Sequence, residues 1–522
     1  MRLGYLAAAS LCVCALSAGA QSYPTNFSGT NLATGLSAPT AFAIAPNGDV
    51  YICQQAGALR LWRPGSGLST VTTFTVNSAG ERGLIGVALD PAFAANRFLY
   101  VYYTAPTPAI HNRISRITLD AAGTAVVAGS EVALLDLNNL SGATNHNGGA
   151  IHFGLDGKLY AGVGDNANSS NSQSIANLLG KVLRINADGT IPADNPSSFP
   201  GIAGTTTGQN RAIWAVGLRN PFTFNVHPGT GRIFVNDVGE GTWEEINDGI
   251  AGRNYGWPGT EGAFNPATFP NFTLPLVAYH HSNGGLNTPG AIGNFTGSAI
   301  TGGTFYSPYA GANPNFPIAF QNDYFFGDIV ASIVRTFDPA ANNGAGFATG
   351  VGGVVDLGVA PDNTLLILNG AGGGSGRLIR VTFTGTSGAC CAPDGTCTLS
   401  NGLNCTAGST FLWGTVSCSP SPCTVPTGAC CRGSTCAVTT AAACSGANTS
   451  FVAAAACNTA GNTTTPCCYA DFNQAGGITV QDIFDFLAEH FGGGIAADFN
   501  QSGDLTVQDI FDFLAGYFTG CV

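Results

Sequence analysis

The segment IHFGLDGKLYAGVGD, residues 151–165, contains two apolar stretches with alternating side chains, joined by the turn LDGK. Period-2 alternation on both sides of a Gly- and Asp-containing turn predicts a β-hairpin. The same design recurs along the chain, which makes it an internal repeat. The other copies are AFAIAPNGDVYIC (41–53), VALDPAFAANRFLYVYY (87–103), FNVHPGTGRIFVNDVG (224–239) and LGVAPDNTLLIL (357–368).

The spacing of these copies predicts how many there are. The interval before the last copy is about twice the others, which leaves room for a weaker copy near Gly302–Asp338. Six hairpin units at such intervals predict an all-β fold, a six-bladed β-propeller over residues 21–385, because radial repetition protects the sheet edges. A β-sandwich is the alternative, although this run of hairpins is long for one.

Composition narrows the class of protein. The 522 residues exceed the roughly 250–300 at which single cores stop growing, so several domains are expected. Only 9% of residues are charged and the net charge is −12, which argues against a nucleic-acid partner because phosphate contacts need a basic face. The 45% hydrophobic content and 73 glycines favour a β-protein with many tight turns over a disordered chain.

The first 20 residues have the features of a secretory signal peptide. Arg2 is followed by an apolar run from Leu3 to Leu16, and Ala18-Gly19-Ala20 offers small residues for cleavage. A membrane anchor is the alternative, but the run is shorter than the roughly 20 residues that a spanning helix needs. No later segment looks able to span a membrane. We therefore expect a secreted, extracellular protein, attached to a cell surface or a scaffold through its later domains.

Cysteines separate the repeats from the rest of the chain. Of 17 cysteines, only Cys53 lies within the hairpin repeats, where we expect it to be buried, and fourteen follow the Gly/Thr/Ser linker at 384–388. Two units that begin with GACC, residues 388–427 and 428–467, have six cysteines each. An oxidising compartment favours three disulfides per unit, with connectivity open, over a zinc site, since neither unit contains histidine. We interpret these small disulfide-rich units as spacers or binding modules.

The last segment, 468–522, repeats with a period of 27 residues: ADFNQAGGITVQDIFDFLAEHF and ADFNQSGDLTVQDIFDFLAGYF. Asp, Asn, a small residue, Gly and Asp at loop positions 1, 3, 5, 6 and 12, followed by an amphipathic stretch, predict a pair of Ca²⁺-loop–helix repeats. The expected ligands are Asp471, Asn473 and Asp482 in the first loop, and Asp498, Asn500, Ser502 and Asp509 in the second.

A paired loop–helix repeat with Asp at position 12 resembles dockerins, which attach catalytic units to cohesin-bearing scaffolds. The resemblance implies a cohesin-like partner. A Ca²⁺-stiffened tail without a partner is the alternative. Cys468 and Cys521 flank the pair and could link its ends.

Three polar residues of the repeats are candidates for chemistry. His146 lies in the glycine-rich NHNGGAIHFG, and Asp165 ends the partner strand of that hairpin, so the two side chains can meet. A carboxylate beside an imidazole fixes its tautomer, as a general base requires. Arg219 follows the apolar strand AIWAVGL. The alternatives are a structural histidine and a turn arginine paired with a carboxylate.

Six motifs in order resemble the glucose/sorbosone dehydrogenase family across the repeats. They are GERGLIG (80–86), HNGG (146–149), GVGD (162–165), LRNP (218–221), DVGEGTWEEIN (237–247) and NYGWP (254–258). The resemblance implies a six-bladed propeller that binds pyrroloquinoline quinone (PQQ) and oxidises a sugar.

The resemblance also implies roles for individual residues. His146 would take the proton of the sugar C1 hydroxyl, Asp165 would orient His146, and Arg219 would polarise a quinone carbonyl. Asn220 would hold the cofactor, and the backbone oxygens of Gly239 and Glu240 would bind the Ca²⁺ that clamps PQQ.

Three positions depart from the family pattern. Glu81 replaces a cofactor-binding glutamine, the segment 327–335 lacks the family's lysine, and 352–356 lacks its pair of arginines. Because PQQ carries three carboxylates, each absent cation removes a charge-assisted hydrogen bond of about 1.5–3 kcal/mol. The alternatives to an enzyme are therefore a non-catalytic binding propeller, like the hedgehog-binding vertebrate protein that shares this fold, and a scaffold component.

Overall fold

The structure is a computed structural model in which the chain forms two compact units, residues 1–385 and 386–522. In the first unit it describes residues 21–282, 295–309, 311–370 and 375–385. In the second it describes residues 386–393, 395–406, 408–415, 417–423, 427–432, 435–440, 443–445, 449–453, 470–473, 478–499 and 502–519. The expected signal peptide, residues 1–20, lies outside the described residues. No helix in these ranges combines the length and the apolar character that a membrane span requires.

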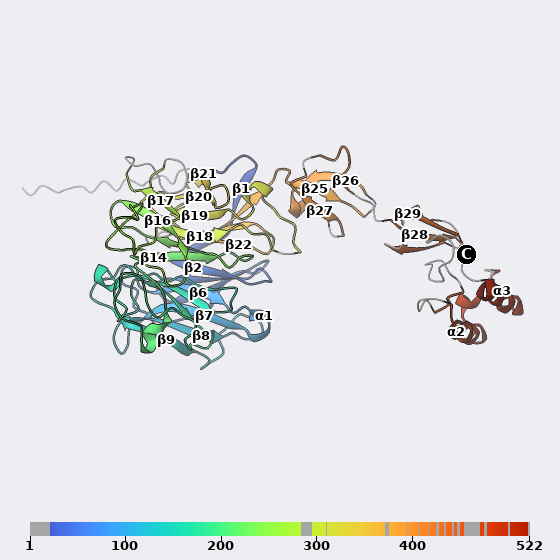
Figure 1. Ribbon diagram of the computed structural model, residues 1–522, viewed down its shortest axis with the longest axis horizontal. Coiled ribbons are helices and arrows are strands. Elements are labelled where there is room, and N and C mark those ends of the chain that lie inside the picture. The colour runs from blue at the N-terminus through green and yellow to red at the C-terminus, as the bar shows by residue number, and fades with distance from the viewer. Residues whose placement is uncertain are drawn as a thin grey trace, which may run out of the picture. The chain divides into compact units, whose positions relative to one another are not determined.

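The described part of the first unit is built from six antiparallel four-stranded sheets (Figure 1). Three of them are β2 (Pro39–Ile44), β3 (Val50–Gln54), β4 (Ala58–Arg63) and β5 (Gly67–Thr73); β6 (Leu84–Leu89), β7 (Phe98–Ala105), β8 (His111–Thr118) and β9 (Val132–Asn139); and β10 (Ile151–Phe153), β11 (Leu159–Val163), β12 (Lys181–Ile185) and β13 (Ile213–Val216). One short helix, α1 (Phe93–Asn96), lies between β6 and β7.

The other three sheets follow the same pattern, except that the last one includes the first strand of the chain. They are β14 (Pro221–Val226), β15 (Ile233–Asp237), β16 (Trp243–Gly249) and β17 (Val277–His280); β18 (Ile300–Phe305), β19 (Tyr324–Asp328), β20 (Ile333–Asp338) and β21 (Asn343–Thr349); and β22 (Val354–Val359), β23 (Leu365–Asn369) and β24 (Ser375–Phe383), completed by β1 (Phe27–Ser37).

The sheets are arranged in a ring. The first strands β2, β6, β10, β14, β18 and β22 each contact the next in this order, and β22 contacts β2. No sheet of the described residues closes on itself by hydrogen bonds. The all-β class is confirmed, and the ring of four-stranded sheets is consistent with a propeller rather than a two-sheet sandwich.

The predicted hairpins are the first two strands of these sheets. The weak copy expected near Gly302–Asp338 corresponds to β18, β19 and β20. Apolar side chains between neighbouring sheets form the core, for example the aromatic cluster in which the rings of Phe234 and Phe305 lie 4.8 Å apart. Cys53 is fully buried, as expected, and burial raises the pKa of its thiol well above the ordinary value.

One buried carboxyl group gives the first unit a testable pH dependence. Asp323, immediately before β19, is 6% exposed, and burial together with the like charge of Asp338 raises its pKa to about 7. The folded protein therefore binds this proton more tightly than the unfolded chain, so stability falls as the pH rises from about 4 to 7. We expect Asp323→Asn to raise the free energy of unfolding by about 1–2 kcal/mol at pH 8 and to change it little at pH 4. Urea unfolding followed by tryptophan fluorescence measures this, and an equal effect at both pH values would contradict it.

The second unit begins with two small three-stranded sheets of the same topology. The first consists of β25 (Gly388–Cys391), β26 (Cys397–Ser400) and β27 (Thr410–Trp413), and the second of β28 (Thr427–Arg432), β29 (Thr435–Thr440) and β30 (Thr449–Ala453). Each has its first strand in the centre, which agrees with the duplication seen in the sequence.

Disulfides link the strands and loops of these small sheets. The first sheet has Cys390–Cys405, Cys391–Cys423 and Cys397–Cys418, and the second has Cys430–Cys444. This fixes the connectivity that the sequence left open for the first sheet. Cys457, Cys467, Cys468 and Cys521 lie outside the described residues.

Two helices follow, α2 (Val480–Phe491) and α3 (Val507–Thr519). Their apolar faces meet through the stacked rings of Phe486 and Phe513, whose centroids are 4.0 Å apart. Each helix is preceded by a threonine whose backbone N–H and hydroxyl donate to the carboxylate three residues later, Thr479 to Asp482 and Thr506 to Asp509. Each carboxylate thereby satisfies the backbone N–H of the threonine that precedes its helix.

Candidate functional site

Four of the expected site residues lie within five residues before the first strands of the sheets, which contact one another around the ring and are called the inner strands here. Glu81 precedes β6, His146 precedes β10, and Arg219 and Asn220 directly precede β14. Because the inner strands occupy equivalent places in successive sheets, the positions before them lie at the same end of the ring.

The remaining expected residues lie just after second strands. Asp165 follows β11, and Gly239 and Glu240 follow β15. Since the second strand of each sheet is antiparallel to the first, its end lies beside the start of the inner strand. A cavity of about 610 Å³ lies at the opposite ends of the inner strands, lined by residues such as Phe153, Asn225 and Phe305, and has none of the expected site residues in its lining.

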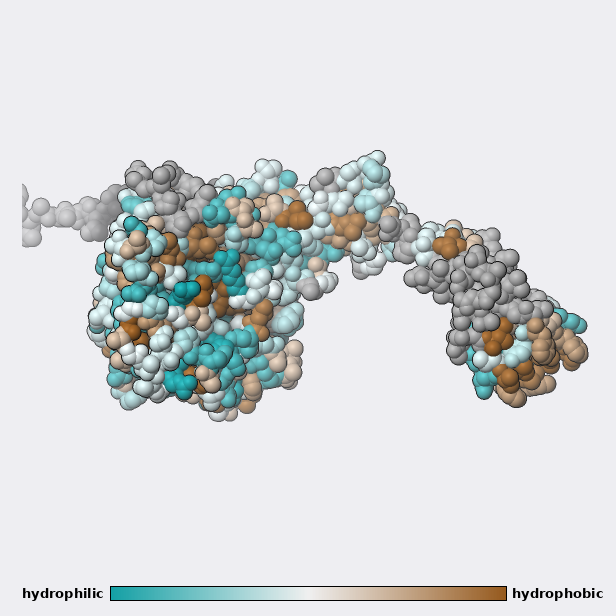
Figure 2. Space-filling view, viewed as in Figure 1, coloured by the Kyte–Doolittle hydropathy of each residue, from teal (hydrophilic) through white to brown (hydrophobic). Residues whose placement is uncertain are grey.

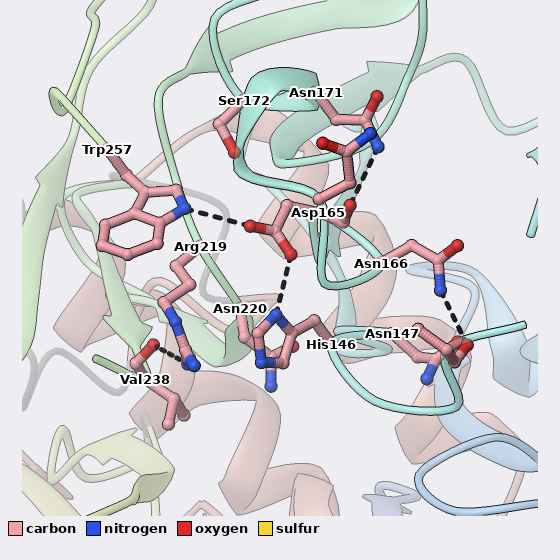
Figure 3. A network of polar contacts seen from close by, with 12 residues as sticks. His146, Asn147, Asp165, Asn166, Asn171, Ser172, Arg219, Asn220, Val238 and Trp257 are labelled. Carbon is pink, nitrogen blue, oxygen red and sulfur yellow. Dashed lines mark hydrogen bonds and ion pairs between the residues drawn. The ribbon is translucent and has the colours of Figure 1, made fainter. Parts of the chain in front are cut away.

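The structure brings His146 and Asp165 together. The imidazole Nδ1 lies 2.7 Å from Asp165 Oδ1, and the Trp257 indole N–H donates to Asp165 Oδ2 at 3.0 Å (Figure 3). Asp165 is 1% exposed, whereas a tenth of the His146 side chain remains accessible. A carboxylate that accepts the Nδ1 proton leaves Nε2, on the far side of the ring, as the basic nitrogen. The pair therefore has the geometry of an oriented general base.

Glu81 holds the backbone of the histidine. His146 has a positive φ of 56°, a conformation that non-glycine residues adopt at a cost. Its N–H donates to Glu81 Oε2 at 2.7 Å, and the same oxygen accepts from the Asn220 side-chain amide at 3.4 Å. Asn220 Oδ1 in turn accepts the Gly148 N–H at 3.0 Å. Glu81 and Asn220 thus fix the loop that carries His146.

Arg219 lies beside this pair. Its Nη1 donates to the Val238 carbonyl at 3.0 Å, and its guanidinium carbon lies 5.6 Å from the centroid of the Trp257 ring (Figure 3). The Nε of Arg219 is buried, and among the described residues it has no hydrogen-bond partner and this side chain takes part in no ion pair. The alternative considered from the sequence, a turn arginine whose side chain pairs with a carboxylate, therefore does not apply to Arg219.

The nearby carboxylate bonds to the backbone instead. Asp237 accepts the N–H groups of Arg219 at 3.0 Å and of Asn220 at 2.7 Å. Burial raises the pKa of Asp237 to about 7. These bonds fix where the Arg219 segment leaves β13 and enters β14.

Carboxylates also hold the loop at Gly239 and Glu240. The Gly239 N–H donates to Glu244 at 3.3 Å and the Glu240 N–H donates to Glu261 at 2.6 Å. Among the described residues, no hydrogen bond ends on the carbonyl oxygen of Gly239 or Glu240. These two oxygens could therefore bind a cation, as the sequence suggested.

The segments that lack the family's cations have other contacts. Arg335, on β20, is the only cationic residue of 327–335, and its guanidinium lies 3.8 Å from the centroid of the Phe295 ring. In 352–356, Asp356 accepts the backbone N–H groups of Phe42 and Leu357. Neither segment contributes a lysine or an arginine pair.

Sequence reasoning gave no role to Trp257, although the motif NYGWP contains it. Trp257 is 92 residues from Asp165 in the sequence, yet its indole contacts both Asp165 and Arg219. The motif itself was the available signal, because a tryptophan beside a candidate dyad offers one N–H donor and a ring face.

The tail loops lie at the starts of the two helices. Asp498 accepts the N–H groups of Ser502 at 2.9 Å and Gly503 at 2.8 Å, and Asp482 accepts the Asn473 N–H at 3.1 Å in addition to capping α2. Asp471, Asp482 and Asp509 are at most 8% exposed. Asn500 lies outside the described residues. Within the described ranges no cluster of three or more His, Cys, Asp or Glu side chains could hold a metal ion, and the expected ligand sets also depend on amide and hydroxyl oxygens.

Known proteins resemble the first unit. The family model "Glucose / Sorbosone dehydrogenase" matches residues 36–380. The aldose sugar dehydrogenase of Escherichia coli K12 is 31% identical over 252 residues, which cover 45% of this chain and 62% of that protein. Quinoprotein glucose dehydrogenase B of Acinetobacter calcoaceticus is 28% identical over 269 residues, covering 45% and 53%. The chain thus spans little more than half the length of these curated relatives.

Solved structures agree on the fold. The apo form of the E. coli aldose sugar dehydrogenase has a TM-score of 0.57 at 24% identity, and covers 68% of this chain and 99% of its own. An oxidoreductase from Thermus thermophilus, described as a glucose dehydrogenase, has a TM-score of 0.54 at 26% identity, with coverage of 68% and 99%. Because the family model spans nearly all of the ring of sheets, the chain belongs to the glucose/sorbosone dehydrogenase family.

Proposed function

We propose that the first unit oxidises the C1 hydroxyl of an aldose or oligosaccharide with PQQ as its cofactor, and that its six sheets are the blades of a six-bladed propeller. The observation that carries the proposal is one cluster at one end of the ring. In it, the Nδ1 of His146 contacts Asp165, and the half-buried Arg219 has a buried Nε without a hydrogen-bond partner among the described residues. Oxidation of an aldose to its lactone removes a hydride from C1 and a proton from the hydroxyl. The His146–Asp165 pair can accept this proton, and the guanidinium of Arg219 can stabilise the negative charge that the hydride brings to its acceptor.

The residues divide the work as follows. His146 Nε2 takes the hydroxyl proton, and Asp165 keeps Nδ1 protonated and stabilises the imidazolium that forms. Arg219 would donate to an oxygen of the bound cofactor, and Asn220 fixes the adjacent loop. Bound PQQ supplies the two-electron acceptor.

The chain fits PQQ at the reacting side of the site. The Nε of Arg219 has no hydrogen-bond partner among the described residues, and a quinone carbonyl or carboxylate would supply an acceptor for this guanidinium. The carbonyl oxygens of Gly239 and Glu240 suit Ca²⁺, which prefers oxygen ligands. On the remaining sides the family's lysine and arginine pair are absent, so we expect weaker PQQ binding than in enzymes that have them.

An isotope experiment tests the oxidised position. The full chain, loaded with PQQ and Ca²⁺, is mixed with glucose deuterated at C1, and single-turnover reduction is followed by stopped-flow absorbance. We expect slower reduction than with glucose deuterated at C2. Equal rates for the two sugars would show that the C1–H bond does not break in the measured step.

A single substitution tests the effect of the family departure at Glu81. Its carboxylate puts a negative charge beside the site of an anionic cofactor, while glutamine would keep an oxygen that accepts the His146 N–H. We expect Glu81→Gln to tighten PQQ binding roughly three- to tenfold, as removal of one partly exposed like charge allows. Fluorescence titration measures the affinity, with Glu131→Gln, a carboxylate outside the site, as control. Weaker binding in Glu81→Gln would mean that the carboxylate is needed.

The second candidate function is a non-catalytic carbohydrate- or protein-binding propeller. The absence of the family's cations at 327–335 and 352–356 favours it. It predicts sugar or protein binding without PQQ.

We also propose that the protein is secreted and that its tail attaches it to a cohesin-like partner or surface scaffold. Figure 2 shows hydrophobic (brown) surface over the end of the chain that carries α2 and α3. Three apolar residues of α2, 61–77% exposed, recur 27 positions later on α3, 62–78% exposed. They are Val480, Phe484 and Phe491, and Val507, Phe511 and Phe518. Duplicated exposed apolar residues on paired helices are typical of a protein-binding surface.

Calcium should stabilise this tail. Because α2 and α3 are the long helices of the described chain, the circular dichroism signal of helix reports mainly on them. Saturating Ca²⁺, at about 100 times its Kd, should stabilise the helices by about 2.7 kcal/mol for each occupied loop and raise their melting temperature. Asp471→Ala combined with Asp498→Ala should remove the effect, with Mg²⁺ as the ion control. The same melting curve with Ca²⁺ and with chelator would contradict Ca²⁺ binding by the loops.

A further inference from the structure

Lys181, the first residue of β12, is a buried cation without an assigned role. It is one of two lysines in the chain, its side chain is fully buried, and no ion pair between described residues includes it. Burial lowers its pKa to about 7, and the charge of Asp165 opposes this shift. A buried ammonium group is costly unless hydrogen bonds compensate it, so its surroundings require an explanation.

Three backbone carbonyls surround the ammonium group. Lys181 Nζ donates to the carbonyl oxygens of Leu179 at 2.6 Å, Asn171 at 2.7 Å and Ser172 at 3.2 Å. An ammonium group has three N–H donors, so all of them are satisfied. The lysine thereby closes the segment 171–179, which connects β11 to β12.

The residues that Lys181 holds are those that hold the candidate site. The Asn171 side-chain amide donates to the Asp165 carbonyl at 2.9 Å, and the Ser172 hydroxyl donates to the Leu218 carbonyl at 2.6 Å. Leu218 precedes Arg219, whose own carbonyl accepts the Asp165 N–H at 2.8 Å. Figure 3 shows Asn171 and Ser172 beside Asp165. One ammonium group is thus connected, through two residues, to the segments that carry the carboxylate and the guanidinium.

We propose that Lys181 is a positioning residue that keeps Asp165 in contact with His146 and sets the Arg219 segment against them. The consequence for activity rests on the function proposed above, whereas the consequence for the Asp165–His146 contact does not. Without the three donors, hydrogen bonds to Lys181 no longer hold the two ends of the segment 171–179 together. The Asp165 carboxylate is then no longer held in contact with the imidazole of His146. Displacements of about 1 Å in a catalytic group can lower rates about a hundredfold.

The test uses Lys181→Met, whose unbranched side chain is one heavy atom shorter and has no hydrogen-bond donors. Lys158→Met, at the turn between β10 and β11 and away from the site, is the matched control. The first readout is the hydrogen-bonded Nδ1 proton of His146, observed by NMR in the full chain labelled with ¹⁵N-histidine and without PQQ. We expect Lys181→Met to lose this downfield signal and Lys158→Met to keep it.

The second readout is turnover of the PQQ-loaded protein. We expect kcat to fall about 10- to 100-fold in Lys181→Met with KM within about twofold, since the change affects orientation and not the sugar contacts. Asn171→Ala removes one link and keeps the ammonium group, so it should move both readouts in the same direction by less. If Lys181→Met does not fold, the Asn171→Ala variant still tests the proposed role of Lys181.

The outcomes separate this proposal from the proposed function. A retained Nδ1 signal and unchanged kcat in both variants would overturn the role of Lys181. A wild-type protein that shows the signal but oxidises no sugar would overturn the proposed function, and the NMR comparison would still test Lys181.

Discussion

Substitution of His146 by Gln should lower kcat for aldose oxidation about 10²- to 10⁴-fold, the usual contribution of a positioned general base. Glutamine is close in size and polar but cannot accept a proton at neutral pH. Its backbone N–H can still donate to Glu81, so the loop before β10 should persist. PQQ affinity is expected to stay within about twofold, because the cofactor contacts proposed here belong to other residues.

Dye reduction with saturating sugar measures this effect, and fluorescence titration measures the affinity. His227→Gln is the control, since His227 follows β14 at the opposite end of an inner strand and its ring bonds to Asn322. Activity of His146→Gln near the wild-type level would exclude His146 as the base.

Asp165→Asn should lower kcat roughly 10²- to 10³-fold with little change in KM. The carboxylate accepts two N–H donors, from His146 and from Trp257, and an amide has only one oxygen. If that oxygen stays with Trp257, the amide NH₂ faces His146 Nδ1 and favours the tautomer with a proton on Nε2. The nitrogen that should accept the sugar proton is then already occupied.

Steady-state kinetics on Asp165→Asn and Asp156→Asn test this argument. Asp156 lies at the opposite end of the same hairpin and pairs with Arg184, so its substitution should affect stability and not turnover. A kcat reduced equally in both variants would indicate a general loss of structure.

Local patterns explain which parts of the fold were predictable. The turn residues and alternating strands around residues 156 and 228 lie within one hairpin each, and such local patterns predicted the first two strands of five sheets of the first unit. The hairpin of the remaining sheet was inferred from the spacing of the other five. The pairing of β1 with β24 joins Phe27 to Phe383, and no local pattern encodes a contact of that separation. The pairing of the cysteines from Cys390 onward likewise depends on the folded strands, so local sequence patterns did not predict it.

The candidate site shows the same contrast between contacts within one hairpin, which were predictable, and contacts between distant segments, which were not. His146 and Asp165 lie on one hairpin, which let spacing and motif predict their contact. Trp257 and Lys181 reach the pair only through tertiary structure, and a lysine at the start of an apolar strand gives no sign that it will be buried. Expectations for Asn500 and for the later cysteines fall on residues that the structure does not describe.

The most direct test of the central claim is a titration of the full chain with PQQ in the presence of Ca²⁺, followed by dye reduction with a panel of aldoses. We predict saturable binding of one PQQ per chain and sugar-dependent reduction, with weaker binding in Arg219→Leu. The absence of saturable binding up to millimolar PQQ would contradict the account and favour a binding propeller.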